Sequence, residues 1–255
     1  MVTKPEVHVI IKPMTLRFSL QDSVPVYHVG GDARTQLDQM EHLLGIDPKR
    51  NVIFDCNLGF LPICSTVLIR GEKTIIVDPG NFHIGLYGII GRALAPHGIG
   101  PDEVDMVVLT HSHLDHMATT FAFPSSELVV GEGELDAARE AFWPQFIDAF
   151  TVDRVKEVRT VRRGEALVRL CDGVHIMHTP GHTSGSLCIL VESGDERVAI
   201  VGDVAMTQEE YVDRRLSHWY PPESRDQINR GLDRVAEWGP TRVVPGHDAA
   251  FRVVT

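Results

Sequence analysis

The sequence predicts an α/β fold on three observations. Short apolar and β-branched runs alternate with helix-like segments along the chain. Several of these runs end directly before a histidine or an aspartate. Hydrophobic residues make up 43% of the 255 residues and charged residues 23%, which is typical of a globular chain with a sizeable core. Because no change in composition marks a boundary, we expect one domain over residues 1–255.

The first part of the chain predicts a hairpin and then a buried strand. Residues 65–80, STVLIRGEKTIIVDPG, contain two β-branched runs around Gly71-Glu72 and end in a turn at Asp78-Pro79-Gly80. Residues 104–111, VDMVVLTH, are too short for a helix and fit a buried strand. That strand would end directly at His111.

The middle of the chain predicts a helix and an aromatic face. Residues 131–142, GEGELDAAREAF, have the pattern of an amphipathic, solvated helix. Phe142, Trp143, Phe146 and Phe150 follow at helix-like spacing, which favours a core face. The alternative is an apolar wall for an acyl or aromatic substrate.

Three later strands are expected to deliver polar residues in the same way. They are VHIMHTPGH, which leads to His182, RVAIVGD, which leads to Asp203, and TRVVPGH, which leads to His247. A helix is predicted from Arg225 to Trp238, with Ser224 and Gln227 as a capping box and Gly239-Pro240 as the stop.

The stretch LTHSHLDHMATT, residues 109–120, contains three histidines and an aspartate within six positions. A buried imidazole or carboxylate without a partner costs a few kcal/mol. A fold would therefore gather four such groups only if something satisfied them all, and a divalent metal ion does so.

The expected strand ends add three more ligands to this stretch. Seven groups converging on one edge can hold two metal ions with a carboxylate between them; they are His111, His113, Asp115, His116, His182, Asp203 and His247. Zn²⁺ suits mixed imidazole and carboxylate ligation, although Mn²⁺ or Fe²⁺ could take the same ligands. Two such ions would share a hydroxide that attacks the substrate, which is typical of a hydrolase site.

The blocks THSHLDH, TPGHTSGS, GD and VPGH resemble the metallo-β-lactamase fold superfamily, whose HxHxDH motif they match. The resemblance implies an αββα sandwich of two mixed β-sheets flanked by helices, with the site at one edge. It implies that His111, His113 and His182 hold one zinc ion, that Asp115, His116 and His247 hold the other, and that Asp203 bridges them. In the superfamily an aspartate at the position of Asp78 orients a ligand histidine.

Within the superfamily, chain length and ligand spacing look most like the N-acyl homoserine lactonases, with a glyoxalase II-like ligand set. The common β-lactamases place a cysteine at the position of Asp203. The lactonases place a tyrosine three residues after the bridging aspartate, where this chain has Met206. We expect hydroxide attack on the carbonyl of a small lactone, ester or thioester, with Asp115 as the catalytic residue that passes a proton to the leaving group.

Two other activities stay open at this point. The segment VVPGHDAAFRV is similar to the small metallo-β-lactamase-domain ribonucleases of animals. A metal-dependent phosphodiesterase or ribonuclease is therefore an alternative activity. A mononuclear iron persulfide dioxygenase shares part of the motif. The substrate pocket is expected to draw on four further residues: His83, His218, Tyr220 and Phe146.

Charge and sequence pattern also limit which binding partners and which cellular location we expect. The net charge of −11 disfavours nucleic acid, because binding to a phosphate backbone is driven by basic surface. No signal-peptide pattern and no apolar run near the ~18 residues of a membrane span is visible. We therefore expect a cytoplasmic enzyme for a small-molecule substrate, with a homo-oligomer left open.

Overall fold

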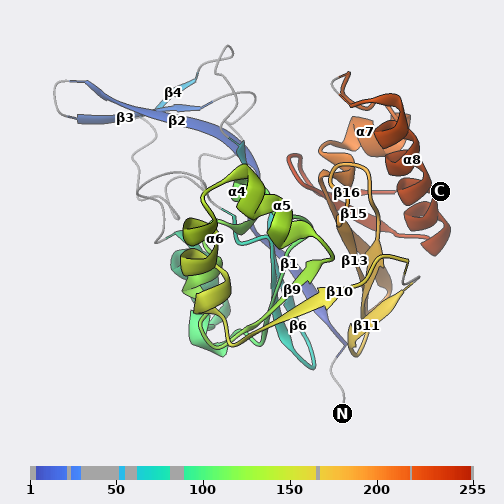
Figure 1. Ribbon diagram of the computed structural model, residues 1–255, viewed down its shortest axis with the longest axis horizontal. Helices are drawn as coiled ribbons and strands as arrows, with labels where there is room; N and C mark the ends of the chain where they lie inside the picture. The colour runs from blue at the N-terminus through green and yellow to red at the C-terminus, as the bar shows by residue number, and fades with distance from the viewer. Residues whose placement is uncertain are drawn as a thin grey trace.

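The computed structural model describes residues 4–21, 24–29, 52–54, 62–80, 89–164, 167–218 and 220–253. Two six-stranded mixed sheets lie face to face, with helices on their outer faces (Figure 1). This arrangement confirms the predicted αββα sandwich. Among the described residues, no helix is both long and apolar enough to cross a lipid bilayer.

The first sheet has the order β1-β6-β7-β8-β9-β10. Its strands are β1 (Glu6–Ile11), β6 (Thr66–Arg70), β7 (Thr74–Val77), β8 (Met106–Val108), β9 (Glu127–Gly131) and β10 (Glu157–Val161). The predicted hairpin is confirmed, because β6 and β7 pair antiparallel with Val67 opposite Val77. From β7 to β10 neighbouring strands pair parallel, so their carboxyl ends meet at one edge.

The second sheet runs in chain order from β11 to β16. Its strands are β11 (Val168–Cys171), β12 (Val174–His178), β13 (Leu187–Ser193), β14 (Glu196–Gly202), β15 (Arg242–Pro245) and β16 (Phe251–Arg252). Only β14 and β15 pair parallel; the other neighbours are antiparallel. The strands expected before His182, Asp203 and His247 are therefore β12, β14 and β15.

Alternation of side chains along the strands builds three apolar layers. In β6, Val67 and Ile69 face the core between the sheets, where they join residues such as Ile189 and Val198 of the second sheet. Leu68 faces the opposite way, into the layer beneath the helices of the first sheet. A third layer lies between the second sheet and its own helices.

Six described α-helices flank the sheets. They are α3 (Ile89–Leu94), α4 (Leu114–Met117), α5 (Glu134–Ala141), α6 (Pro144–Phe150), α7 (Gln208–Asp213) and α8 (Pro222–Trp238). Short 3₁₀ turns connect several elements: η3 (Ala95–His97), η4 (Pro101–Glu103), η5 (Thr120–Ala122), η6 (Val152–Arg154) and η7 (Asp203–Ala205).

The predicted C-terminal helix exists, but its start was predicted wrongly. Helix α8 begins at Pro222, and Pro221 rather than Ser224 is its N-cap, without a side-chain capping bond. Proline is favoured in the first turn because its φ is already helical, and because an N–H at this position would have no partner within the helix, so its absence costs nothing. The helix ends at Trp238, before Gly239, as expected.

The aromatic group was also interpreted wrongly as a core face. Phe142 and Trp143 lie at the junction between α5 and α6, so the aromatic residues do not share one continuous helix. Trp143 is 80% exposed, and Phe142, Phe146 and Phe150 are exposed as well. In α6 only Ile147 is buried.

A further sheet was not predicted. It has the order β4-β3-β2-β5, formed by β2 (Met14–Gln21), β3 (Val24–Val29), β4 (Val52–Phe54) and β5 (Pro62–Ile63). The long β2–β3 ribbon extends beyond the sandwich at the upper left of Figure 1.

Candidate metal centre

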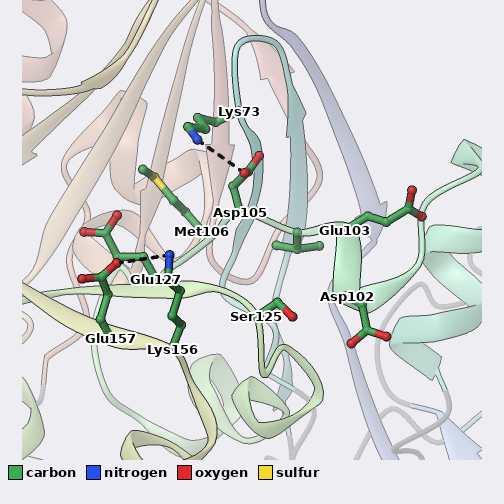
Figure 2. Close-up of a pocket in the computed structure, with 10 residues that line it drawn as sticks. Lys73, Asp102, Glu103, Asp105, Met106, Ser125, Glu127, Lys156 and Glu157 are labelled. Carbon is green, nitrogen blue, oxygen red and sulfur yellow. Dashed lines mark hydrogen bonds and ion pairs between the residues drawn. The ribbon is translucent and has the colours of Figure 1, made fainter.

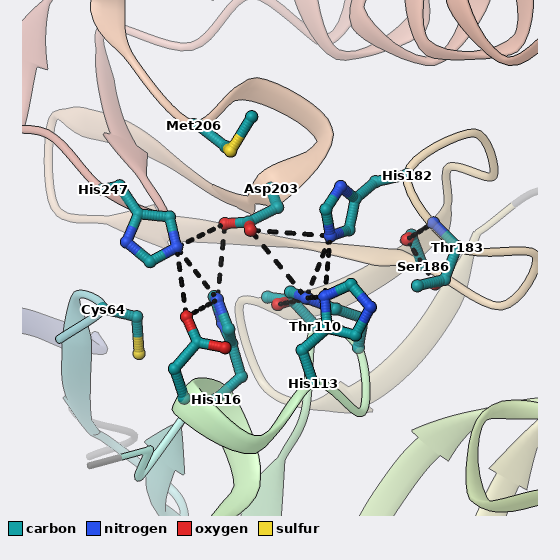
Figure 3. A network of polar contacts seen from close by, with 12 residues as sticks. Cys64, Thr110, His113, His116, His182, Thr183, Ser186, Asp203, Met206 and His247 are labelled. Atoms are coloured by element: carbon teal, nitrogen blue, oxygen red, sulfur yellow. Dashed lines mark hydrogen bonds and ion pairs between the residues drawn. The ribbon is translucent and has the colours of Figure 1, made fainter. Parts of the chain in front are cut away.

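All seven predicted ligands lie where strands of the two sheets end. β8 of the first sheet leads into the loop with His111 and His113 and into α4 with Asp115 and His116. β12, β14 and β15 of the second sheet lead to the other three, which are His182, Asp203 and His247. The cluster therefore spans the boundary between the two sheets, which we call the seam (Figure 3).

The seven side chains form two groups. His111, His113, His182 and Asp203 make one, which we call group one, and Asp115, His116 and His247 make group two; within each, the ligand atoms lie within 4.8 Å of one another. In group one, Nδ1 of His113 is 3.0 Å from Nε2 of both His111 and His182. In group two, Oδ2 of Asp115 is 3.3 Å from Nε2 of His247.

Asp203 lies between the two groups. Its Oδ1 is 3.3 Å from Nε2 of both His116 and His247, and its Oδ2 is 3.5 Å from Nε2 of His182. The side chain is 5% exposed, and Oδ1 has no hydrogen-bond partner of acceptable geometry in the part of the chain that the structure describes. A buried carboxylate oxygen in that state needs a cation or water to compensate it.

The donor set fits divalent metal ions. Three of the ring nitrogens that face away from the cluster have partners of their own: His111 Nδ1 contacts Thr110 Oγ1 at 3.1 Å, His116 Nδ1 contacts Asp78 Oδ2 at 2.9 Å, and His182 Nδ1 contacts Tyr220 Oη at 2.5 Å. Such partners can fix the tautomer in which the inward nitrogen keeps its lone pair. Imidazole and carboxylate donors together suit Zn²⁺, and also Mn²⁺ or Fe²⁺.

Asp78 links the two groups through hydrogen bonds to Thr110, the neighbour of His111, and to His116. It is buried, and its Oδ1 accepts a hydrogen bond of 2.7 Å from the backbone N–H of Thr110. Its Oδ2 lies 2.7 Å from Thr110 Oγ1 and 2.9 Å from His116 Nδ1. Asp78 adopts a φ of 50°, a left-handed conformation that is uncommon for residues other than glycine. Thr110, which carries this network to His111, was not found by sequence reasoning because no spacing rule marks it.

The metal-free site is electrostatically asymmetric. Burial lowers the pKa of His182 to about 4 and holds that of His111 well below its usual value. For His247, burial acts in the same direction, but the carboxylates of Asp203 and Asp115 outweigh it and raise its pKa to about 9. The pKa of His116 is likewise raised, because the Cys64 thiol and the carboxylates of Asp203, Asp78 and Asp115 outweigh burial. Around neutral pH His247 is therefore protonated, whereas His182 is not.

The four predicted pocket residues are placed differently from one another. Tyr220 is 7% exposed, and its hydroxyl contacts His182. His218 is exposed, and its backbone carbonyl accepts a hydrogen bond from Arg225. Phe146 is 40% exposed in α6 and stacks on Phe150. His83 lies outside the described residues.

A separate pocket lies at the opposite end of the first sheet (Figure 2). It has a volume of about 320 Å³ and is lined by charged side chains, including the pair Lys73 and Asp105. Met106, which also lines it, begins β8, whereas the ligand histidines follow the other end of that strand. The pocket is therefore not part of the metal centre.

Comparison with known proteins supports the resemblance found in the sequence. A probable metallo-hydrolase of Methanocaldococcus jannaschii is 26% identical over 200 residues, which cover 72% of this chain and 86% of that protein. An N-acyl homoserine lactonase of Bacillus thuringiensis is 25% identical over 154 residues, 59% of this chain and 58% of that protein.

A solved structure shares the fold. It is an N-acyl homoserine lactone hydrolase with the product N-hexanoyl-L-homoserine at its catalytic metal centre, and it aligns with a TM-score of 0.63 and 18% identity over 97% of this chain and 94% of that one. A family model described as the metallo-beta-lactamase superfamily matches residues 59–247, which include all seven ligands and Asp78. The chain belongs to the metallo-beta-lactamase superfamily.

Proposed function

We propose that this protein is a hydrolase that uses two zinc ions to cleave a small lactone, ester or thioester. The observation that carries the proposal is the position of Asp203, whose two carboxylate oxygens face different ligand groups. A single-metal site has no need of a buried carboxylate shared in this way.

The residues that would hold the ions are those of the two groups. His111, His113 and His182 would hold one ion, Asp115, His116 and His247 the other, and Asp203 would contact both. When bound, such ions polarise a carbonyl oxygen and make water nucleophilic near neutral pH.

Asp115 is our candidate for moving the proton. Burial acts to raise its pKa, but His116 and His247 outweigh it, so that its pKa lies below the usual value. Among the described residues its ion pairs run through Oδ2, which leaves Oδ1 to accept a proton and return it to the leaving group. Asp115 is also less buried than Asp203, so a substrate can reach it.

The lactone is the first substrate to test because the lactonase relatives share this fold and part of this sequence. Met206 distinguishes this chain from the lactonase pattern. Its thioether has no proton to donate to a carbonyl oxygen, and Figure 3 places it beside Asp203 and His247. We therefore include esters and thioesters, because a phenolate or thiolate leaving group departs more readily than an alkoxide and needs less help from a tyrosine.

The test compares four substrates on one zinc-reconstituted sample: N-hexanoyl homoserine lactone, p-nitrophenyl acetate, an acyl thioester and bis(p-nitrophenyl) phosphate. Controls are EDTA-treated protein and Asp203→Asn. We expect carbonyl turnover well above phosphodiester turnover and loss of both in the controls. Faster cleavage of the phosphodiester would overturn the carbonyl assignment and favour the ribonuclease-like alternative.

Metal analysis of the same sample tests the number and identity of the ions. Two zinc ions per chain support the proposal. One iron per chain, with oxygen-dependent turnover of a persulfide, would replace it with the dioxygenase alternative.

A further inference from the structure

Glu134 is a buried carboxylate that the proposed chemistry does not use. It is the first residue of α5 and only 1% exposed, although the sequence pattern predicted a solvated helix here. Burying a charged side chain is costly unless hydrogen bonds compensate it. The partners of Glu134 therefore reveal why it is there.

Both carboxylate oxygens of Glu134 accept hydrogen bonds from loops that carry metal ligands. Oε2 lies 2.8 Å from the backbone nitrogen of Ser112 and 3.0 Å from its Oγ. Oε1 lies 2.9 Å from the backbone nitrogen of Gly185. Within the described part of the chain, Glu134 forms no ion pair with Lys, Arg or His, so these neutral donors are what holds the charge.

The two loops belong to different sheets. Ser112 lies between His111 and His113 on the loop after β8. Gly185 lies three residues after His182, on the loop between β12 and β13. One carboxylate thus joins the loops that supply the three histidines of group one, across the seam.

We propose that Glu134 is a positioning residue that sets the distance between the two halves of group one. The inference rests on the proposed metal site. Nε2 of His111, Nδ1 of His113 and Nε2 of His182 lie 3.0 to 3.2 Å from one another. A small shift of one loop relative to the other would therefore change the geometry in which they could bind a metal ion. Carboxylate hydrogen bonds are stronger than neutral ones and hold such a distance better.

Close packing around Glu134 supports this role. A Cβ added to Gly131, at the end of β9, would lie 1.9 Å from the carbonyl oxygen of Gly185. The two chain segments therefore touch without space for a side chain, directly beside the carboxylate. The loop of Gly185 cannot be moved closer, and Glu134 prevents it from moving away.

Group two has a different link across the seam. The backbone N–H of Ser65 donates to the carbonyl of Gly246 at 2.8 Å, and its Oγ donates to the carbonyl of Pro245 at 2.8 Å. These bonds hold the loop of His247. Glu134 should consequently affect group one and leave group two nearly unchanged.

The test uses Glu134→Gln, which keeps the size of the side chain. Glutamine has one acceptor oxygen and a donor NH₂, so one of the two loops would face a donor instead of an acceptor. The matched control is Glu140→Gln, because Glu140 lies on the same helix α5 and is exposed.

Zn²⁺ affinity of the EDTA-treated proteins is measured by competition with a chromophoric chelator. For Glu134→Gln we expect the tighter of the binding events to weaken by about 10- to 100-fold, the usual effect of losing a partner that orients a ligand. The visible spectrum of the Co²⁺-substituted protein should change as well. Glu140→Gln should match the unmodified protein in both measurements.

A merely structural role predicts a different result. It would lower the melting temperature of the metal-free protein while leaving the Co²⁺ spectrum of the folded fraction unchanged. That result would overturn the proposal, and so would a Zn²⁺ affinity equal to that of the unmodified protein. If Glu134→Gln does not fold, Ser112→Ala removes the hydroxyl that lies 3.0 Å from Oε2 and 2.7 Å from the backbone carbonyl oxygen of Glu134, and it should weaken Zn²⁺ binding in the same direction but less. None of these measurements uses substrate turnover, so they stand even if the carbonyl substrates fail.

Discussion

Gly246 lies so close to Asp203 that a Cβ added to Gly246 would be 2.0 Å from Oδ1 of Asp203. The glycine of the VPGH block therefore allows the carboxylate of Asp203 to reach its position between the two groups. The carbonyl of Gly246 also accepts the hydrogen bond from Ser65, so this residue both takes part in a hydrogen bond across the seam and leaves room for Asp203.

Gly246→Ala should displace Asp203 and reduce metal retention by at least tenfold, since losses of this order follow from disturbing the support of a ligand. Bound metal per chain after dialysis, together with the melting temperature, measures the effect. Gly91→Ala is the control, because a Cβ there meets nothing within 4 Å and should stabilise α3 by up to about 1 kcal/mol. Equal metal retention in both variants would contradict the close contact.

Asp203→Asn and His111→Ala should each abolish hydrolysis and weaken metal binding. Asparagine has the shape of aspartate but lacks the charge that both groups share. Rates and metal content are compared with Asp213→Asn, an exposed aspartate on α7. Full activity of either site variant would rule out the proposed centre.

Tyr220→Phe should weaken metal binding by about tenfold without unfolding the protein. The change removes only the hydroxyl that contacts His182 Nδ1 at 2.5 Å, while the ring stays in the apolar layer beside α8. Tyr211→Phe is the matched control, because Tyr211 is buried in the same layer and its ring packs on Phe251. Chelator competition on both variants gives the answer; equal affinities would mean that the hydroxyl does not support His182.

The two ligand groups should differ in their dependence on pH. His247, with a pKa raised to about 9, must lose a proton before it binds a cation, so affinity at its group rises as pH increases and levels off above about 9. His182, with a pKa lowered to about 4, is already unprotonated above pH 5, and the pKa of His111 is also held well below its usual value, so metal binding by these two histidines should change little over the same range.

Isothermal titration in two buffers with different ionisation enthalpies tests this difference, because it counts the protons released with each ion. At pH 6 we expect group one to fill first with little release, and the group of His247 to fill second with release. Equal proton release in both steps would show that the asymmetry is absent.

The sequence predicted the parts of this site that are contiguous or lie at strand ends. His111 to His116 share one short stretch, and His182, Asp203 and His247 each follow an apolar run that forms a strand. Strand ends could be recognised because they depend on local pattern alone.

What could not be predicted depends on contacts between distant residues. Glu134 looks like any polar residue of an amphipathic helix, and only the meeting of two sheets buries it. The spacing of Phe142 to Phe150 suggested one helix face, but a helix break between α5 and α6 divides it. In the additional sheet, β2 pairs with its neighbour in the chain, β3, and the polar–apolar alternation of residues 15–21 is a local signal for that strand; only the pairings of β2 with β5 and of β3 with β4 join segments distant in the sequence.

The seam also determines when the protein can acquire its metal. His116 and His247 are 131 positions apart, and each ligand group combines residues from both sheets. No early segment of a growing chain therefore holds a full set of ligands, and tight capture has to wait until the two sheets have docked. From then on the ion stabilises the native state by mass action, about 2.7 kcal/mol when free metal is 100 times its dissociation constant. Metal supply would thus control how long the folded protein persists more than how fast it forms.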